Sequence, residues 1–444
     1  MEKSRFSRQN WRILIMFGLI GQIAWSVENM YFNLFAFDTY PDLNTVTLMV
    51  QLSGVVATLV TLFAGTLSDK LGNRRKFISI GYAIWGVTVA LFGFISPELV
   101  ELIFKTDAQR SVTIALALII IGDCVMTLFG SSANDAAFNA WVTDNTTQEN
   151  RGTVEGVLSI LPLIAMLIVA GGFGILVGFL GYRLLFLILG ILISIAGIVG
   201  IFTVKDKDGL KPQGGLKDIF YGFKPSVVRS NAPFYITLVI IGVYGIACQV
   251  FMPYLIIYMK TYLYFTEIEY SIVFGLAILV GAAINLYLAR LSDRRNKVRL
   301  MYIAALVMAL GLFAMYMSRG MTKVGNLIFF GMAGLLMITG YIFVSALTSS
   351  TLRDLTPEEA VGKLQGVRMV FSVLIPMIFG PMIGNAINAA RNIPLPDMGS
   401  ADTMTTLYIP APEIFLVAAL ITLLIFTLIP ILDKTLIKKT NSTI

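Results

Sequence analysis

Twelve apolar segments of about 20 residues or more dominate this chain, and they restrict it to folds that lie in a lipid bilayer. They span residues 12–37, 44–67, 77–96, 112–140, 153–180, 183–204, 233–259, 268–290, 299–318, 325–351, 363–388 and 410–432. Only 13% of the 444 residues are charged, about half the share of a soluble protein, and the mean hydropathy is +0.81. The sequence therefore predicts an all-α membrane protein with 12 transmembrane helices.

A phrase that occurs twice indicates that these helices form two related sets. Asp144–Val157 and Asp354–Val367 match at six of fourteen positions, and each copy links two apolar segments. A second pair of loops, Gly65–Lys76 and Ala289–Leu300, agrees with the same division. Tandem repeats of membrane helices are how many transporters build two bundles that move about a central site. We expect a 6+6 repeat of two pseudo-symmetric six-helix bundles.

The repeat places an N-terminal six-helix bundle at 1–204, a cytoplasmic linker at 205–231 and a C-terminal six-helix bundle at 232–444. Within the linker, apolar residues from Leu216 to Phe223 recur at helical spacing beside Lys217 and Lys224. This pattern predicts a short helix on the inner membrane surface, with a disordered tether as the alternative.

Lys and Arg set the expected orientation. With the N-terminus in the cytoplasm, most of the 33 Lys and Arg residues fall in inner segments, as the positive-inside rule requires. The net charge of +7 is explained by the bases that orient the protein in the membrane and by their attraction to anionic lipid head groups, so no nucleic-acid partner is expected. We expect a multi-pass protein of the cytoplasmic (plasma) membrane, monomeric, with both termini in the cytoplasm.

Several chemistries are excluded by what the sequence lacks. There is no His, so imidazole proton relays and His-ligated metals are ruled out. Cys124 and Cys248 lie in different apolar segments, without metal-ligand spacing. No Gly-x-x-x-x-Gly-Lys-Ser/Thr loop is present to bind ATP phosphates, so uphill work must draw on an ion gradient or a partner. We expect no catalytic residues, no metal and no cofactor.

Two acids inside apolar segments are the candidates for ion coupling. Glu28 lies in segment 12–37 and Asp123 in segment 112–140, at about the same predicted depth. Ionised groups in hydrocarbon are costly and usually functional, and two nearby carboxyls can share a proton or bind a small cation. The alternative is a structural hydrogen bond from each to a neighbouring helix.

Asp135 lies further along the same segment, on one face with Ser131 and Asn139. We expect it to act as a gate by pairing with a basic residue such as Arg368, with a coupling role as the alternative.

A polar stripe bordered by aromatic residues predicts the substrate site. Polar residues recur along segment 12–37 at helical spacing, beside Trp25. Amide and hydroxyl groups beside aromatic rings suit a sugar-like ligand. The candidates in the first half are Gln22, Trp25, Ser26, Asn29 and Asn33, and those in the second half are Gln249, Tyr254 and Asn285.

The charged loops Gly65–Lys76 and Ala289–Leu300 are expected to take part in the conformational change. An acid at a helix end followed by bases can hold an opposing helix in one conformation and release it in another. Setting topology alone is the alternative for the bases. The candidate gating residues here are Asp69, Arg74, Arg75, Asp293 and Arg294.

The loop sequence Gly65-Thr-Leu-Ser-Asp69-Lys-Leu-Gly72-Asn73-Arg-Arg75 resembles the signature of the major facilitator superfamily between its second and third helices. It departs at Asn73, where Arg is usual, and the second copy lacks both glycines. The resemblance covers the whole chain and implies alternating access around a central cavity lined by the first, fourth, seventh and tenth helices.

A finer resemblance concerns the repeated phrase itself. Asp144, Thr146 and Arg151-Gly152, with Asp354 and Pro357 in the second copy, look like the corresponding loops of cation-coupled sugar porters of the glycoside–pentoside–hexuronide and sucrose-type groups. Sodium-coupled melibiose-type members use acids in the second helix, and segment 44–67 has none. Protons are therefore expected as the coupling ion rather than sodium.

The sequence thus predicts a secondary active transporter that imports a small sugar or glycoside together with protons. An exporter of drugs, lipids or other amphipathic molecules is the alternative within the same superfamily. A membrane enzyme is not expected, because no loop nucleophile with a base and no metalloprotease pattern is present.

Overall fold

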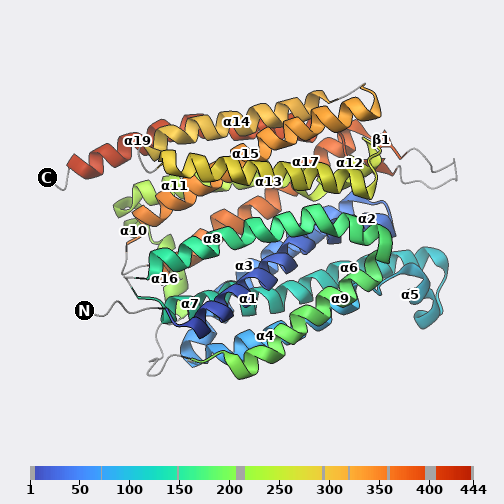
Figure 1. Cartoon of the computed structure of the whole chain (residues 1–444), viewed down its shortest axis with the longest axis horizontal. Helices are drawn as coiled ribbons and strands as arrows, with labels where there is room; N and C mark the ends of the chain where they lie inside the picture. The colour runs from blue at the N-terminus through green and yellow to red at the C-terminus, as the bar shows by residue number, and fades with distance from the viewer. Residues whose placement is uncertain are drawn as a thin grey trace. The chain divides into compact units, whose positions relative to one another are not determined.

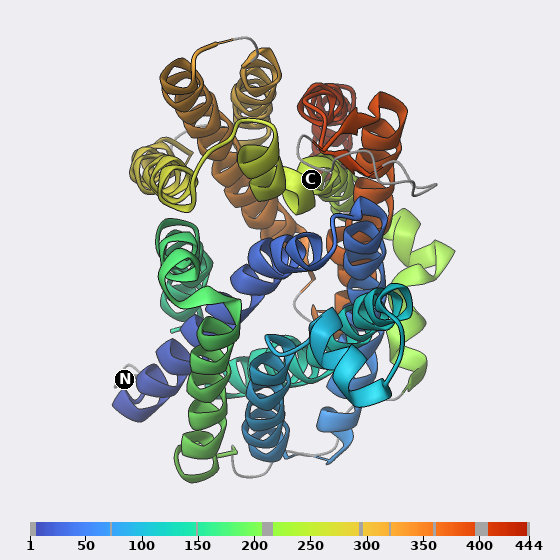
Figure 2. The same cartoon turned by 90° about the vertical axis from the view of Figure 1, so that its right-hand side faces the viewer.

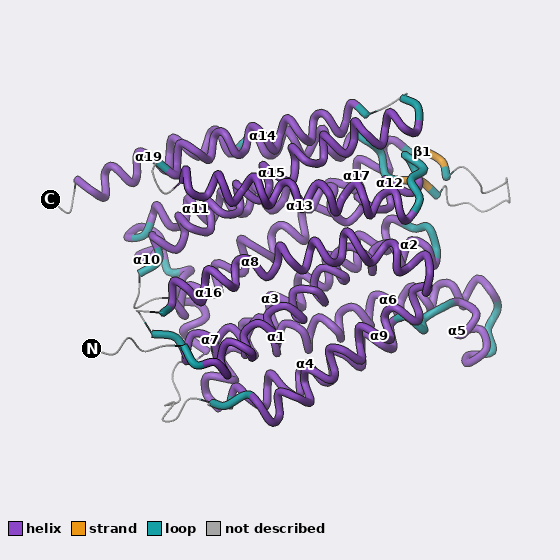
Figure 3. The backbone as a smooth tube through the Cα atoms, viewed as in Figure 1, coloured by secondary structure: helices purple, strands orange, loops and turns teal. Residues whose placement is uncertain are grey.

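The computed structural model describes residues 6–71, 73–147, 150–206, 216–292, 296–318, 321–357, 361–395 and 407–441. Nearly all of them are helical (Figures 1 and 3). Contacts between residues divide the chain into two units, of which unit 1 contains Met1–Tyr40 and Leu52–Leu216 and unit 2 contains Pro41–Gln51 and Lys217–Ile444. Figure 2 shows the helices of each unit side by side as a bundle.

Unit 1 holds the helices of the first half of the chain. Three short π-helical segments, η1 to η3, interrupt them; the label η also marks the 3-10 helices η4 and η5 and the π segment η7 of unit 2. The elements are α1 (Arg8–Val27), η1 (Glu28–Phe32), α2 (Asn33–Thr39), most of α3 (Leu43–Leu71), α4 (Arg74–Phe92), α5 (Pro97–Phe104), α6 (Ala108–Gly130), η2 (Ser131–Phe138), α7 (Asn139–Asn145), α8 (Arg151–Ile168), η3 (Val169–Phe173) and α9 (Gly174–Thr203).

Unit 2 holds the second half together with the first residues of α3. A two-stranded antiparallel ribbon, in which Ile393 pairs with Ile409, joins its last long helices. The elements are η4 (Leu216–Phe223), α10 (Pro225–Ser230), α11 (Ala232–Phe251), η5 (Met252–Tyr254), α12 (Leu255–Thr261), α13 (Glu267–Ser292), α14 (Lys297–Met317), α15 (Lys323–Leu355), α16 (Val361–Met369), η7 (Val370–Leu374), α17 (Ile375–Arg391), β1 (Ile393–Pro394), β2 (Tyr408–Ile409), α18 (Glu413–Leu423) and α19 (Ile425–Asn441).

The membrane-spanning helices agree with the prediction. Within the described residues, eleven helical stretches are long and apolar enough to cross a bilayer, and one of them, Thr153–Thr203, is 51 residues long. Gly181 divides that stretch with a φ of 69°, a backbone conformation that favours glycine, so it contains two spans. The fold is therefore the predicted all-α membrane fold of twelve helices.

Lipid-facing and buried side chains separate cleanly on these helices. Leu91, Ile121 and Leu192 are more than half exposed, which suits contact with hydrocarbon rather than water. Because lipid is as apolar as leucine, helices in a membrane associate through close packing, which small residues permit. In unit 2, Gly380 and Gly384 of α17 lie directly against Gln249 and Val250 of α11.

Candidate functional site

Glu28 lies at the point where the first membrane helix changes from α to π geometry. α1 ends at Val27, and η1 begins at Glu28. The Glu28 side chain is 7% exposed, and Thr127 Oγ1 of α6 donates a hydrogen bond to its Oε1 atom at 3.0 Å. Its Oε2 atom is buried and has no hydrogen-bond partner among the described residues. Single π turns occur frequently at functional sites.

Asp123 lies on α6, one turn before Thr127, and is 1% exposed. Ser53 of α3 is hydrogen-bonded to its carboxyl group, while Asp123 Oδ1 is buried without a partner in the described part of the chain. The carboxyl groups of Glu28 and Asp123 interact electrostatically. The structure thus brings the two acids predicted for ion coupling to one place, and their role there stays a prediction.

If both Glu28 and Asp123 were ionised, their negative charges would not be balanced by a cationic side chain among the described residues. Neither acid forms an ion pair with any described Lys or Arg residue. A buried charge without a partner costs several kcal/mol or more, and carboxyl groups relieve that cost by taking up a proton or a cation. The site can therefore change its charge by binding a small ion.

Asp135 lies in η2, further along the same helix. Ser131 Oγ donates to Asp135 Oδ2 at 3.1 Å, and Asn134 Nδ2 donates to Oδ1 at 3.1 Å. The Asp135 carboxyl also interacts electrostatically with Glu28. Arg368, its predicted gating partner, is exposed on α16 of unit 2, and the pairing stays a prediction.

A polar cavity of about 110 Å³ lies beside Asp135 within unit 1. Its polar lining comes from Gln22 of α1 and from Asn134, Asp135 and Asn139, with Leu161 of α8 on its apolar side. A cavity of this size and polarity has room for several water molecules. Among the predicted substrate-binding residues, Gln22 is the one that lines it.

The rest of the polar stripe on the first membrane helix follows the helix outward from Gln22. Trp25 and Ser26 are half-buried, and the Trp25 ring packs on Trp85 with centroids 5.0 Å apart. Asn29 is exposed, and its Nδ2 atom donates to Trp25 O. Asn33 is buried, with Nδ2 donating to Asn29 O and Oδ1 without a partner among the described residues.

The candidates of unit 2 lie in different surroundings. Tyr254 is fully buried, and its hydroxyl donates to Pro381 O at 2.9 Å and lies 2.7 Å from Thr47 Oγ1. Asn285 is buried, and its Nδ2 atom donates to backbone oxygens of α13 and α15. Gln249 is half-buried against Gly380. Protein groups already bond the polar atoms of Tyr254 and the amide nitrogen of Asn285.

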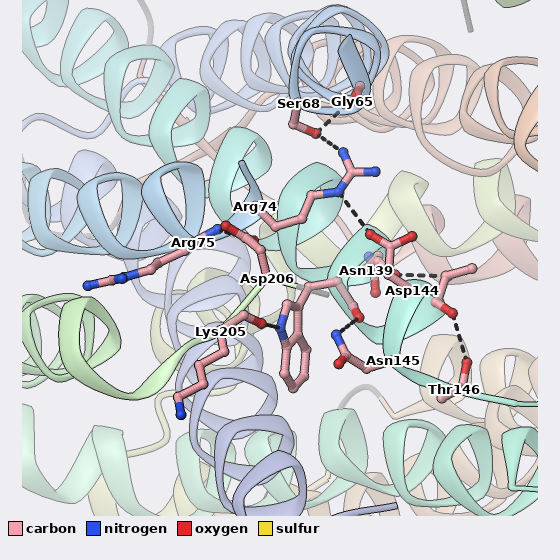
Figure 4. A network of polar contacts seen from close by, with 12 residues as sticks. Gly65, Ser68, Arg74, Arg75, Asn139, Asp144, Asn145, Thr146, Lys205 and Asp206 are labelled. Atoms are coloured by element: carbon pink, nitrogen blue, oxygen red, sulfur yellow. Dashed lines mark hydrogen bonds and ion pairs between the residues drawn. The ribbon is translucent and has the colours of Figure 1, made fainter. Parts of the chain in front are cut away.

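The first charged loop forms a network that Figure 4 shows. Arg74 is 6% exposed; its Nη1 atom donates to Ser68 Oγ at 2.6 Å and its Nε atom to Asp144 Oδ2 at 3.1 Å. The backbone N–H of Arg75 donates to Asp206 at 2.9 Å. The side chain of Asp69, and both Asp293 and Arg294, lie outside the described residues.

Unit 2 contains a counterpart of this ion pair. Lys297, at the start of α14, lies 2.7 Å from Asp354 and donates to Ser350 at 2.8 Å. Asp144 and Asp354 are the equivalent first residues of the repeated phrase, and each pairs with a base at the start of the helix that follows a charged loop. The internal repeat is thus visible in the contacts as well as in the sequence.

The two ion pairs predict different costs of disruption. Asp144→Asn removes a charged hydrogen-bond acceptor from the buried Arg74 guanidinium, so we expect the free energy of unfolding to fall by about 2 kcal/mol. The matched change Asp354→Asn removes an exposed pair and is expected to cost about 0–1 kcal/mol. Thermal unfolding of both variants in the same detergent measures the difference, and equal losses would contradict it.

The family is decided by comparison with known proteins. The sequence profile of the Major Facilitator Superfamily matches residues 13–381. The chain belongs to this superfamily. No curated protein sequence matches the chain significantly. This superfamily member is an integral multi-pass membrane protein and a transporter rather than an enzyme.

Solved structures show the same fold at low identity. A mutant of the nucleoside transporter NupG is 12% identical, with 95% of this chain and 98% of that chain covered and a TM-score of 0.68. A bacterial homolog of the human lysosomal transporter Spinster, inward-facing and unoccupied, is 13% identical over 97% of this chain and 98% of that chain, with a TM-score of 0.66. A bacterial metal transporter is 12% identical over 97% and 100%, with a TM-score of 0.59.

Sequence reasoning missed some of the residues that build this superfamily member's polar interior. Thr127 and Ser53 bond the two buried acids, and Tyr82 donates to Asn134 Oδ1 at 2.8 Å. For Thr127 the signal was present, because it lies four residues from both Asp123 and Ser131. For Ser53 and Tyr82, which lie on other helices, spacing along one helix gave no indication.

Proposed function

We propose that this transporter imports a small glycoside together with protons, by alternating access. The observation that carries the proposal is the buried pair of Glu28 and Asp123, whose carboxyl groups interact and each keep one unbonded oxygen. A site that must change its charge to be stable in a membrane is what coupling to an ion gradient requires. In this proposal, loading of the pair with a proton permits the conformational change that carries substrate across.

We propose protons rather than sodium as the coupling ion because of the oxygen ligands that surround Glu28 and Asp123. A metal cation is held by several oxygen ligands, whereas a proton needs one carboxyl oxygen and a neighbour. Among the described residues, no group of three or more acids or cysteines is placed to hold a metal ion. The carboxyl groups of Glu28 and Asp123 interact electrostatically, and such a pair is suited to take up and release a proton.

A glycoside is proposed as substrate on the chemistry of the Gln22 cavity. The carboxamide of Gln22 can both donate and accept hydrogen bonds, as sugar hydroxyls require, and the carboxamides of Asn134 and Asn139 line the same cavity. The similar NupG structure is that of a nucleoside transporter. A nucleoside is a glycoside of ribose, so the sugar expected from sequence and the nucleoside of that relative share one chemistry.

The location and orientation belong to the same proposal. The distribution of Lys and Arg supports a cytoplasmic membrane location with both termini inside. Import with protons then uses the inward proton gradient across such a membrane.

Counterflow in vesicles is the experiment that tests the substrate class. Reconstituted vesicles are loaded with unlabelled compound and assayed with sugars, glycosides, nucleosides and amphipathic cations in turn. We expect labelled glycoside or nucleoside to exchange, and an inwardly directed proton gradient to drive its accumulation. Transport of amphipathic cations alone, driven by the opposite gradient, would favour the exporter instead.

A further inference from the structure

A row of polar residues runs along the fourth membrane-spanning helix from Asp123 to the Gln22 cavity. Asp123, Thr127, Ser131, Asp135 and Asn139 follow one another at intervals of four. The first three are at most 1% exposed, and Asp135 is half-buried beside the cavity. Burying polar and ionisable side chains inside a membrane helix costs free energy, and such residues usually have a function.

The π geometry of η2 keeps this row together. In an α-helix each step of four residues overshoots one turn by about 40°, so a long row at this spacing winds around the helix. The wider i→i+5 turn of Ser131–Phe138 reduces that drift. Within this segment Ser131 donates to Asp135, and the Asp135 carboxyl interacts electrostatically with Glu28.

At each end of the row a hydroxyl is hydrogen-bonded to an acid. Thr127 donates to Glu28 Oε1, and Ser131 donates to Asp135 Oδ2. One helical turn, about 5.4 Å, separates Thr127 from Ser131, a distance over which a water molecule can bridge two hydroxyls. The titratable groups that interact with these acids are Asp123 and Cys124 on α6 and Tyr82 on α4, besides Glu28 and Asp135 themselves.

We propose that Asp135 accepts the coupled proton from Glu28 through the hydroxyls of Thr127 and Ser131, and then delivers it to the Gln22 cavity. In the transfer, the Thr127 hydroxyl first turns its proton away from Glu28. The O–H bond of protonated Glu28 then breaks and an O–H bond forms on the Asp135 carboxylate, while Thr127, a water molecule between the two hydroxyls and Ser131 each accept one proton and donate one. Asp135 then releases the proton to the cavity. This rests on the proposed proton coupling and assigns Asp135 to the path rather than to a gate.

Hydrogen–deuterium exchange of the Glu28 carboxyl tests the relay without any substrate. The purified protein is moved into heavy water, and infrared spectroscopy follows the shift of the protonated carboxyl band that is lost in Glu28→Gln. We expect Asp135→Asn to retain this band but to slow its exchange by roughly tenfold or more. Ser131→Ala, a milder change in the same path, should slow it less, and Ser132→Ala beside it should leave the rate unchanged.

The outcomes separate the two proposals. An unchanged exchange rate in both Asp135→Asn and Ser131→Ala would overturn the relay while leaving Glu28 as a proton carrier, and would return Asp135 to a gating role. If the wild-type protein shows no protonated Glu28 band across the pH range in which it stays folded, proton coupling at Glu28 fails and the relay fails with it.

Discussion

Glu28→Gln and Asp123→Asn each abolish uphill accumulation of substrate while exchange of labelled for unlabelled substrate continues. Either change leaves a neutral amide of nearly the same shape in place of an acid that is at most 7% exposed. The conformational change that exchange requires remains available, because the site no longer has to neutralise a buried charge. Net uphill transport is lost, because the amide binds no proton and the proton gradient is no longer coupled to substrate movement.

Vesicles containing each variant report both activities side by side. Accumulation is measured under an imposed proton gradient, and exchange is measured without one. Glu98→Gln is the matched control, because Glu98 is an exposed acid on α5, outside the membrane spans. Full accumulation in both Glu28→Gln and Asp123→Asn would show that these acids do not couple transport to protons.

Gly86→Ala strongly destabilises unit 1. Gly86 of α4 lies directly against Gly190 O and the backbone of Ser194 on α9, so an added methyl group overlaps backbone atoms that cannot rotate away. Overpacking of this kind costs about 1–3 kcal/mol, and the contact between two long helices leaves little room for relaxation. We expect a lower unfolding temperature and less folded protein after purification.

Gly334→Ala on α15 provides the comparison, because a methyl group there meets no described atom within 4 Å beyond its chain neighbours and the backbone of its own helix. Alanine also favours the helix over glycine by about 0.5–1 kcal/mol, so this variant should be as stable as the wild type or more so. Size-exclusion profiles after heating measure both variants. Equal stability of the two would mean that α4 and α9 do not pack as closely as described.

The fold could be predicted from the sequence because membrane helices are recognisable by length and apolarity. The boundary between segments 153–180 and 183–204 was expected, and Gly181 marks it in the structure. The π segments could not be predicted, since a π turn changes hydrogen bonding without changing the apolar pattern. The short helix Pro97–Phe104 has capping signals in Ser96 and Pro97, but it lies between the apolar segments 77–96 and 112–140 and is too short to be recognised by its apolar length.

The candidate site was predictable only in part. Glu28 and Asp123 stand out because acids are rare in apolar segments, and equal depth indicated that they meet. Partners on other helices depend on the rotation of each helix about its axis, which one sequence specifies weakly. Tyr254 is an example: its residue type suggested a ligand contact, which stays a prediction, but the hydrogen bond of its hydroxyl to Pro381 and its contact with Thr47 could not be read from the sequence.

Proton movement driven by substrate is the measurement that decides whether transport is coupled to protons through Glu28. Vesicles that contain the transporter and a trapped pH dye are given an inward gradient of the glycoside or nucleoside found by counterflow, with no pH gradient imposed. We expect the lumen of wild-type vesicles to acidify as substrate enters, and Glu28→Gln vesicles to take up no protons. Substrate entry into wild-type vesicles without any change of luminal pH would contradict this expectation.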